Sequence, residues 1–146
     1  MARGRFISTD ITKDKRVSDL ADDTSRLAFT WAITLADAEG RVYGDPALLR
    51  SLLFPRCDKI TIAQMEDYIR EWHDCGLIYW YEAEGDRYIW FPAFDKNQVG
   101  LRKDREAPSS IPPPPEEALA LYREPQEIPK RKAKGYKEGE YSKFIE

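Results

Sequence analysis

TIAQMEDYIREWHDCGLIYWYEAEGDRYIWF, residues 61–91, predicts a helix that runs directly into a pair of strands. Thr61 is a suitable N-cap for the helix. Apolar residues then recur with spacings of three, four and three, which places them on one helical face: Ile62, Met65, Ile69 and Trp72. Gly76 is expected to end the helix.

The rest of this stretch predicts a β-hairpin. Residues 77–83 and 87–93 are rich in aromatic and β-branched side chains, and Glu84–Gly85–Asp86 between them forms a tight turn. Because side chains alternate between the two faces of a strand, the hairpin aromatics cannot all point inward. We therefore expect an exposed aromatic patch that forms a partner surface or a homodimer interface, drawn from Tyr79, Trp80, Tyr81, Tyr88, Trp90 and Phe91.

Two further helices and a short strand precede this stretch. Leu27, Trp31 and Leu35 step by four and predict the buried stripe of a helix over residues 23–37. Residues 41–43 predict a short extended segment, and Asp45–Pro46 predicts the start of a helix with a leucine-rich face that ends at Pro55. The sequence thus predicts an α+β fold, a winged helix-turn-helix with a three-helix core and a C-terminal β-hairpin wing.

The charge distribution divides the chain into four parts. Residues 1–16 form a basic arm of net charge +3, whereas residues 17–92 carry −7, and we expect the winged-helix domain over residues 17–94. Residues 95–115 are predicted to be a basic and Pro-rich linker in which Pro112–Pro115 form an extended spacer; a docking segment for an aromatic groove is the alternative. Residues 116–146 are predicted to be a flexible, disordered charged tail with one short helix.

Several classes of function lack sequence support. No apolar run is long enough to cross a bilayer and the start is not a secretory signal, so we expect a cytoplasmic protein without membrane contact. Cys57, Cys75 and His73 are too few and wrongly spaced for a disulfide framework, a zinc site or a Cys–His nucleophile. Phosphate-loop, nucleophile-elbow and metalloprotease motifs are missing, and we expect neither enzymatic activity nor a cofactor.

The order of the segments resembles one known family. The relevant pieces are Arg3 and Arg5 at the start, SRLAFTWAITLADAEGRV (25–42), LLRSLLFP (48–55), CGLIYWYEAEGDRYIWFPAF (75–94) and DKNQ (95–98). Together they resemble the N-terminal winged-helix domain of phage and prophage replication proteins, the replisome organisers of DnaD type, over about residues 1–115. The resemblance implies a DNA-associated role in a bacterial host cell, in replication initiation, with a helicase or its loader as partner. Members of this group often continue into a second helical domain, whereas about thirty residues follow the proline run here.

Candidate DNA-binding residues are mainly basic and fall into three groups. The arms should reach a narrow minor groove and the backbone, and they form one positive surface if the two segments lie together; their residues are Arg3, Arg5, Lys13, Lys15, Arg16, Lys96, Arg102, Lys103 and Arg105. On the third helix, Gln64 and Arg70 are suited to reading adenine and guanine edges. In the tail, nonspecific phosphate contacts are expected from Lys130, Arg131 and Lys132.

Alternatives remain for the third helix and for the arms. Four acidic residues share the exposed face of the third helix and would repel phosphates, so a merely solvated face is one alternative: Glu66, Asp67, Glu71 and Asp74. The arm cations can equally be ordinary solubilising charges. A second hypothesis is therefore a non-enzymatic protein–protein adaptor that uses the acidic winged helix for docking or oligomerisation. A transcriptional regulator is a third.

Overall fold

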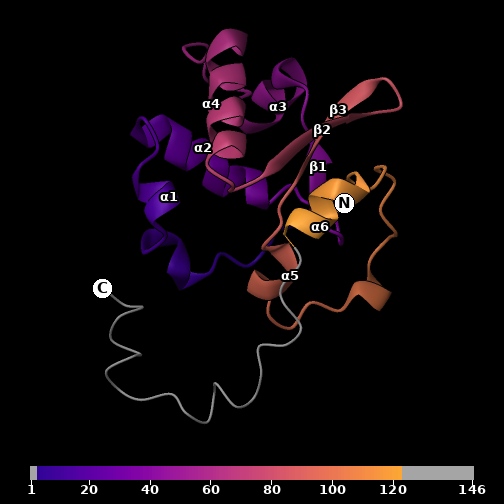
Figure 1. Cartoon of the computed structure of the whole chain (residues 1–146). Coiled ribbons are helices and arrows are strands. Elements are labelled where there is room, and N and C mark those ends of the chain that lie inside the picture. The colour runs from indigo at the N-terminus through magenta and orange to yellow at the C-terminus, as the bar shows by residue number, and fades with distance from the viewer. Residues whose placement is uncertain (1–2, 123–146) are drawn as a thin grey trace, which may run out of the picture.

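The computed structural model describes residues 3–122, which form a mixed α+β structure with helices around a small three-stranded antiparallel sheet (Figure 1). The elements in chain order are η1 (Thr9–Thr12), α1 (Lys15–Ser18), α2 (Asp23–Ile33), β1 (Arg41–Tyr43), α3 (Pro46–Leu53), α4 (Ile62–Asp74), β2 (Tyr79–Ala83), β3 (Asp86–Trp90), α5 (Phe94–Asn97), η2 (Lys103–Arg105) and α6 (Glu116–Leu121). None of the helices among these residues has the length and apolar character that a membrane span requires.

α4 forms where the sequence predicts it. Thr61 and Gln64 form a reciprocal capping box at its start, and Gly76, with a φ of +87°, follows its end. Its buried face consists of Met65, Tyr68, Ile69 and Trp72. Ile62, expected on this face, is instead 51% exposed, because it lies in the first turn where the helix extends beyond the core.

The hairpin closes with a tighter turn than predicted. Glu84 and Gly85 both have positive φ, +53° and +80°, as a two-residue type I′ turn requires. Asp86 therefore belongs to β3 and pairs with Ala83. β1 pairs with β3, which gives the sheet order β1-β3-β2. The inner face of the sheet carries the buried side chains of Val42 and Ile89.

α2 shows the main error of the sequence-based prediction. The helix ends at Ile33 and not near residue 37, and its buried side chains are Ser25, Ala28, Phe29 and Ala32. Leu27 and Trp31, predicted to be core, are 41% and 44% exposed. Phe29 packs edge-on against Trp72 of α4 and Ser25 accepts the Trp72 indole N–H, so this side of α2 faces α4, whereas Leu27 and Trp31 face away from the core.

α3 begins at Pro46 with Asp45 as its N-cap, as predicted, and buries Leu49 and Leu53. The turn from α3 to α4 is held by Arg50, whose guanidinium donates hydrogen bonds to the backbone carbonyls of Cys57 and Ile60. These two carbonyls lie in the irregular segment between the helices, where no helical or strand partner reaches them.

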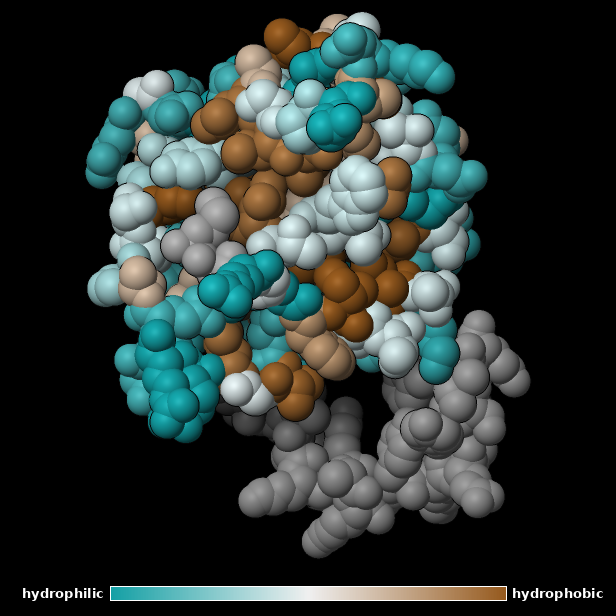
Figure 2. All heavy atoms as spheres, turned by 180° about the vertical axis from the view of Figure 1, so that it is seen from behind, coloured by the Kyte–Doolittle hydropathy of each residue, from teal (hydrophilic) through white to brown (hydrophobic). Residues whose placement is uncertain are grey.

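The segments on either side of the core are packed against it and do not form free arms. Ile11 from the N-terminal segment and Leu101 from the segment after the hairpin pack partly buried against the core, and Ile111 is buried. Figure 1 shows this later segment looping out after α5 and returning so that α6 lies beside the sheet. From behind, hydrophobic residues gather in the middle of the surface, and hydrophilic residues lie mainly along its margin (Figure 2).

Replacement of Arg50 by alanine is expected to lower the free energy of unfolding by about 1–3 kcal/mol, because the carbonyls that it satisfies lose their donors. Urea denaturation measures this difference. Arg56→Ala is the matched control, since Arg56 is exposed in the same turn, and it should change the free energy by less than about 0.5 kcal/mol. Equal effects of the two substitutions would contradict the role given to Arg50.

Candidate functional site

The N-terminal segment and the segment after the hairpin are joined by Arg5. Its guanidinium donates two hydrogen bonds to the Glu106 carboxylate, at 2.7 and 2.8 Å, and a third to the carbonyl of Ala36 at 3.0 Å. The Arg5 side chain is only 3% exposed and lies 5.5 Å from the Phe94 ring centroid. Arg5 is therefore not on a free arm: its charge is paired inside the protein, and contact with DNA would first have to break these hydrogen bonds.

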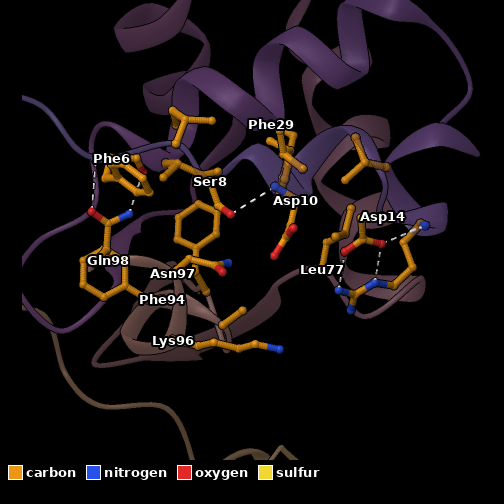
Figure 3. Close-up of a pocket in the computed structure, with 17 residues that line it drawn as sticks. Phe6, Ser8, Asp10, Asp14, Phe29, Leu77, Phe94, Lys96, Asn97 and Gln98 are labelled. Atoms are coloured by element: carbon orange, nitrogen blue, oxygen red, sulfur yellow. Dashed lines mark hydrogen bonds and ion pairs between the residues drawn. The ribbon is translucent and has the colours of Figure 1, made fainter. Parts of the chain in front are cut away.

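A second link joins the same two segments. The Phe6 N–H donates to Gln98 Oε1 at 3.0 Å, and Gln98 Nε2 donates back to the Phe6 carbonyl at 2.8 Å. Figure 3 shows this pair beside a cavity of about 170 Å³, with Asp10 from the N-terminal segment and Lys96 from α5 on opposite sides. The condition set for one positive surface, that the N-terminal segment and the segment after the hairpin lie together, is thus met.

Not all of the basic residues predicted to bind DNA from these two segments are free of ion pairs. Besides Arg5, four form ion pairs with neighbouring carboxylates: Lys15 with Asp19, Arg16 with Asp14, Arg102 with Asp104, and Lys103 with Glu39 and Asp95. The hydrogen bond from Arg16 lowers the pKa of the Asp14 carboxyl. Exposed cations without an ion pair among residues 3–122 remain at four predicted positions, which we term the basic edge: Arg3, Lys13, Lys96 and Arg105.

The two candidates on α4 are engaged in local contacts. Gln64 completes the capping box and also donates to the Tyr68 hydroxyl at 3.3 Å. Arg70 pairs with Glu66 at 2.9 Å and with Asp67 at 3.7 Å. Base reading by either residue would first have to break these contacts. Lys130, Arg131 and Lys132 lie outside the described residues.

The structure also identifies cations that the sequence analysis missed. Arg56 and Lys59 are exposed in the turn between α3 and α4, with Asp58 between them. Arg87 was also not predicted; it lies over the Trp80 ring beside the predicted Arg70, with the guanidinium carbons of Arg87 and Arg70 at 5.4 and 5.8 Å from the ring centroid. Exposure of Arg56 and Lys59 could have been predicted from the sequence, because they lie in a short irregular segment between two helices. The contacts with Trp80 could not, because they arise only from the tertiary fold.

The outer face of the sheet carries the aromatic patch predicted from alternation. Rings follow one another across the strands, with centroids 5.9–6.4 Å apart, in the order Tyr43, Tyr88, Tyr81 and Tyr79. Trp80, by contrast, points to the inner side, where its Nε1–H donates to the carbonyl of Gly44 at 2.9 Å.

The chain itself covers part of this patch with residues 107–122. The Tyr81 hydroxyl donates to the Pro112 carbonyl at 2.7 Å, Arg41 donates to the carbonyl of Ile111 at 2.9 Å, and Tyr122 packs edge-on against Trp90. Burial raises the pKa of Tyr81 to about 12. Pro115 keeps the extended conformation expected for the proline run. The segment is nevertheless docked on the sheet and is not a free spacer.

None of the described residues forms a cluster of three or more His, Cys, Asp or Glu side chains suited to a metal ion. Comparison with protein-family models, curated proteins and solved structures gives no match to this chain.

Tyr81→Phe should lower the free energy of unfolding by about 1 kcal/mol, because the Pro112 carbonyl loses its donor while the ring stays in place. Tyr88→Phe on the adjacent strand is the control, since the Tyr88 hydroxyl has no hydrogen bond among the described residues. Urea titrations of the three proteins provide the comparison. An unchanged midpoint for Tyr81→Phe would show that residues 107–122 are not docked as described.

The Arg5–Glu106 pair predicts a pH dependence of stability. Hydrogen bonding from Arg5 lowers the pKa of the Glu106 carboxyl below its ordinary value of 4.5. Since the folded pKa is the lower one, the pair stabilises the fold above about pH 4.5, and this contribution is lost as the pH falls through the folded pKa. Between about pH 6 and pH 3, the free energy of unfolding of the Glu106→Gln variant should therefore fall by less than that of the unchanged protein.

Glu117→Gln is the matched control, since Glu117 is exposed on α6 and has no ion pair among residues 3–122. Its stability should follow the pH dependence of the unchanged protein. Parallel curves for all three proteins would mean that the Arg5–Glu106 pair contributes nothing measurable.

Proposed function

We propose that this chain is a DNA-binding protein of the phage-type replication-initiation or replisome-organising kind, built on a winged helix-turn-helix. The order of elements from α2 to β3 supports the fold: helix, strand, helix, helix and hairpin, with the first strand paired to the last. α3 and α4 follow each other in the chain, as the two helices of a helix-turn-helix do, although the connection over residues 54–61 is longer than the turn of about three or four residues in that motif. Contact with a helicase or its loader stays a prediction from the resemblance.

The observation that carries the proposal is the basic edge. Arg5–Glu106 and Phe6–Gln98 fix two segments, far apart in sequence, beside each other. Along them stand the exposed cations of the basic edge, and no ion pair within the described residues neutralises these cations. Free cations of this kind gain affinity by displacing counterions from phosphates, which paired cations do less well.

The charge of the remaining surface supports docking through this edge and not through α4. Residues 3–122 contain sixteen basic and twenty-one acidic side chains. Exposed acidic residues line α4 and the hairpin: Asp67, Asp74, Glu82, Glu84 and Asp86. Because these carboxylates would face phosphates if α4 entered the major groove, we place the DNA along the basic edge, with the acidic hairpin turned away.

Fluorescence anisotropy with labelled duplex and single-stranded DNA, at low and moderate salt, tests this proposal. The full chain should bind with an affinity that falls steeply with salt. Replacing the four cations of the basic edge by alanine should weaken duplex binding by roughly 100-fold or more at low salt. The same replacement should flatten the logarithmic salt dependence by about 0.9 for each phosphate that the variant no longer neutralises.

Two further variants locate the binding surface. Alanine at Arg56 and Lys59 tests the helix-turn-helix face and should leave affinity within about threefold of the unchanged chain. Alanine at Lys130, Arg131 and Lys132 tests the tail. Binding that survives loss of the basic edge but disappears with the tail or turn cations would contradict this placement of the DNA. Failure of the full chain to bind either DNA would favour the adaptor hypothesis, with the acidic surface of α4 and the hairpin offered to a basic partner.

A further inference from the structure

The cavity of about 170 Å³ between the N-terminal segment and α5 has an apolar wall that belongs to the hydrophobic core (Figure 3). Phe29 and Phe91 in this wall are buried, with ring centroids 6.0 Å apart, and Phe29 also packs edge-on against Trp72. Because the core holds these rings, the wall keeps its shape without a ligand. The other apolar residues of the lining include Ile11, Leu77 and Phe94.

The polar side chains around the cavity fall into two sets. One set already has partners inside the protein. Arg16 pairs with Asp14 at 2.7 Å, and the Gln98 amide exchanges hydrogen bonds with the Phe6 backbone. The Ser8 hydroxyl accepts a backbone N–H of η1. The side chains of the other set make no hydrogen bond or ion pair with any of residues 3–122: Asp10, Lys96 and Asn97.

These three side chains come from both sides of the cavity. Asp10 lies on η1, whereas Lys96 and Asn97 lie on α5, and Figure 3 shows the Asp10 carboxylate and the Asn97 amide pointing toward the same space. The cavity thus presents a negative group on one side and a positive group on the other. The Phe6–Gln98 hydrogen bonds fix the two sides relative to each other. A ligand that carries both charges can therefore pair with both sides at once.

We propose that this cavity binds a free α-amino acid with an apolar side chain, of the phenylalanine or leucine type. The ligand's side chain lies against the apolar wall, its ammonium pairs with Asp10, and its carboxylate pairs with Lys96. The Asn97 amide offers a donor to the carboxylate and an acceptor to the ammonium. An apolar cavity of about 150 Å³ can hold a benzene ring, so one ring or a branched four-carbon chain fits the volume here.

Other classes of ligand fit this cavity less well. A nucleotide is too large for it, and the phosphates would meet the carboxylates of Asp10 and Asp14. A long acyl chain exceeds the volume, and an uncharged hydrocarbon would make no use of the three unpartnered polar side chains. Small-molecule sites combine an apolar lining with a few placed polar groups, as this cavity does. The inference goes beyond DNA binding and does not depend on it.

NMR titration of the isotope-labelled full chain with L-phenylalanine and L-leucine, without DNA, tests the site. Each amino acid should bind with a dissociation constant of about 1 mM or below, as expected for a ligand of this size. N-acetyl-phenylalanine lacks the ammonium and phenylethylamine lacks the carboxylate, so each should bind at least about tenfold more weakly than phenylalanine. Glycine, which has no apolar side chain, should give no detectable binding.

Two substitutions assign the charged contacts. Asp10→Asn should weaken phenylalanine binding at least about tenfold and remove most of the difference between phenylalanine and its N-acetyl derivative. Lys96→Gln should weaken it likewise and remove most of the difference between phenylalanine and phenylethylamine. Asp58→Asn and Lys13→Gln are the matched controls. Both residues are exposed and lie outside the cavity lining, so neither change should alter the affinity by more than about twofold.

No chemical-shift change with either amino acid up to about 10 mM would overturn the proposal, since a ligand of this size that fits should bind more tightly. So would benzyl alcohol that binds as tightly as phenylalanine, or affinities unchanged by both Asp10→Asn and Lys96→Gln. Lys96 also belongs to the basic edge, whereas Asp10→Asn leaves the four cations of that edge in place. Because the titrations contain no DNA, this proposal and the proposed DNA binding can fail independently.

Discussion

The orientation of α2 depends on one buried hydrogen bond. Trp72 of α4 is fully buried, and its indole N–H donates to Ser25 Oγ at 3.0 Å. Ser25, also fully buried, donates in turn to Glu71 at 2.9 Å, and the second oxygen of Glu71 accepts the backbone N–H of Ala21. A buried N–H without a partner is costly, so Ser25 must face α4. Because Ser25 is fixed there, Leu27 and Trp31 must face outward.

This constraint explains where prediction from the sequence failed. Local signals were sufficient for the strand at residues 41–43, for the N-caps Asp45 and Thr61, and for the hairpin, since capping and turn chemistry act over a few residues. The face of α2 was mispredicted because hydrophobicity alone favours Leu27 and Trp31 over alanines. The side of α2 that faces α4 is instead set by the hydrogen bond between Trp72 and Ser25, two residues that are far apart in the sequence.

The surface sites likewise divide into features that local sequence predicts and features that depend on contacts between distant residues. The sequence left open whether the two basic segments meet, and the structure shows that they do, through Arg5–Glu106 and Phe6–Gln98. The sequence could not show that Arg5 forms an ion pair with Glu106, 101 residues away. Nor could it show that residues 107–122 dock on the outer aromatic face of the sheet. Ion pairs and docked segments between distant parts of the chain leave no periodic signal.

A double-mutant cycle on Ser25→Ala and Trp72→Phe tests this account most directly. Each single substitution should lower the free energy of unfolding, and the pair should be coupled by about 1 kcal/mol or more, because either change alone already removes the hydrogen bond. Urea denaturation of the four proteins gives the coupling energy. Effects that add to within about 0.3 kcal/mol would contradict the claim that this bond sets the orientation of α2.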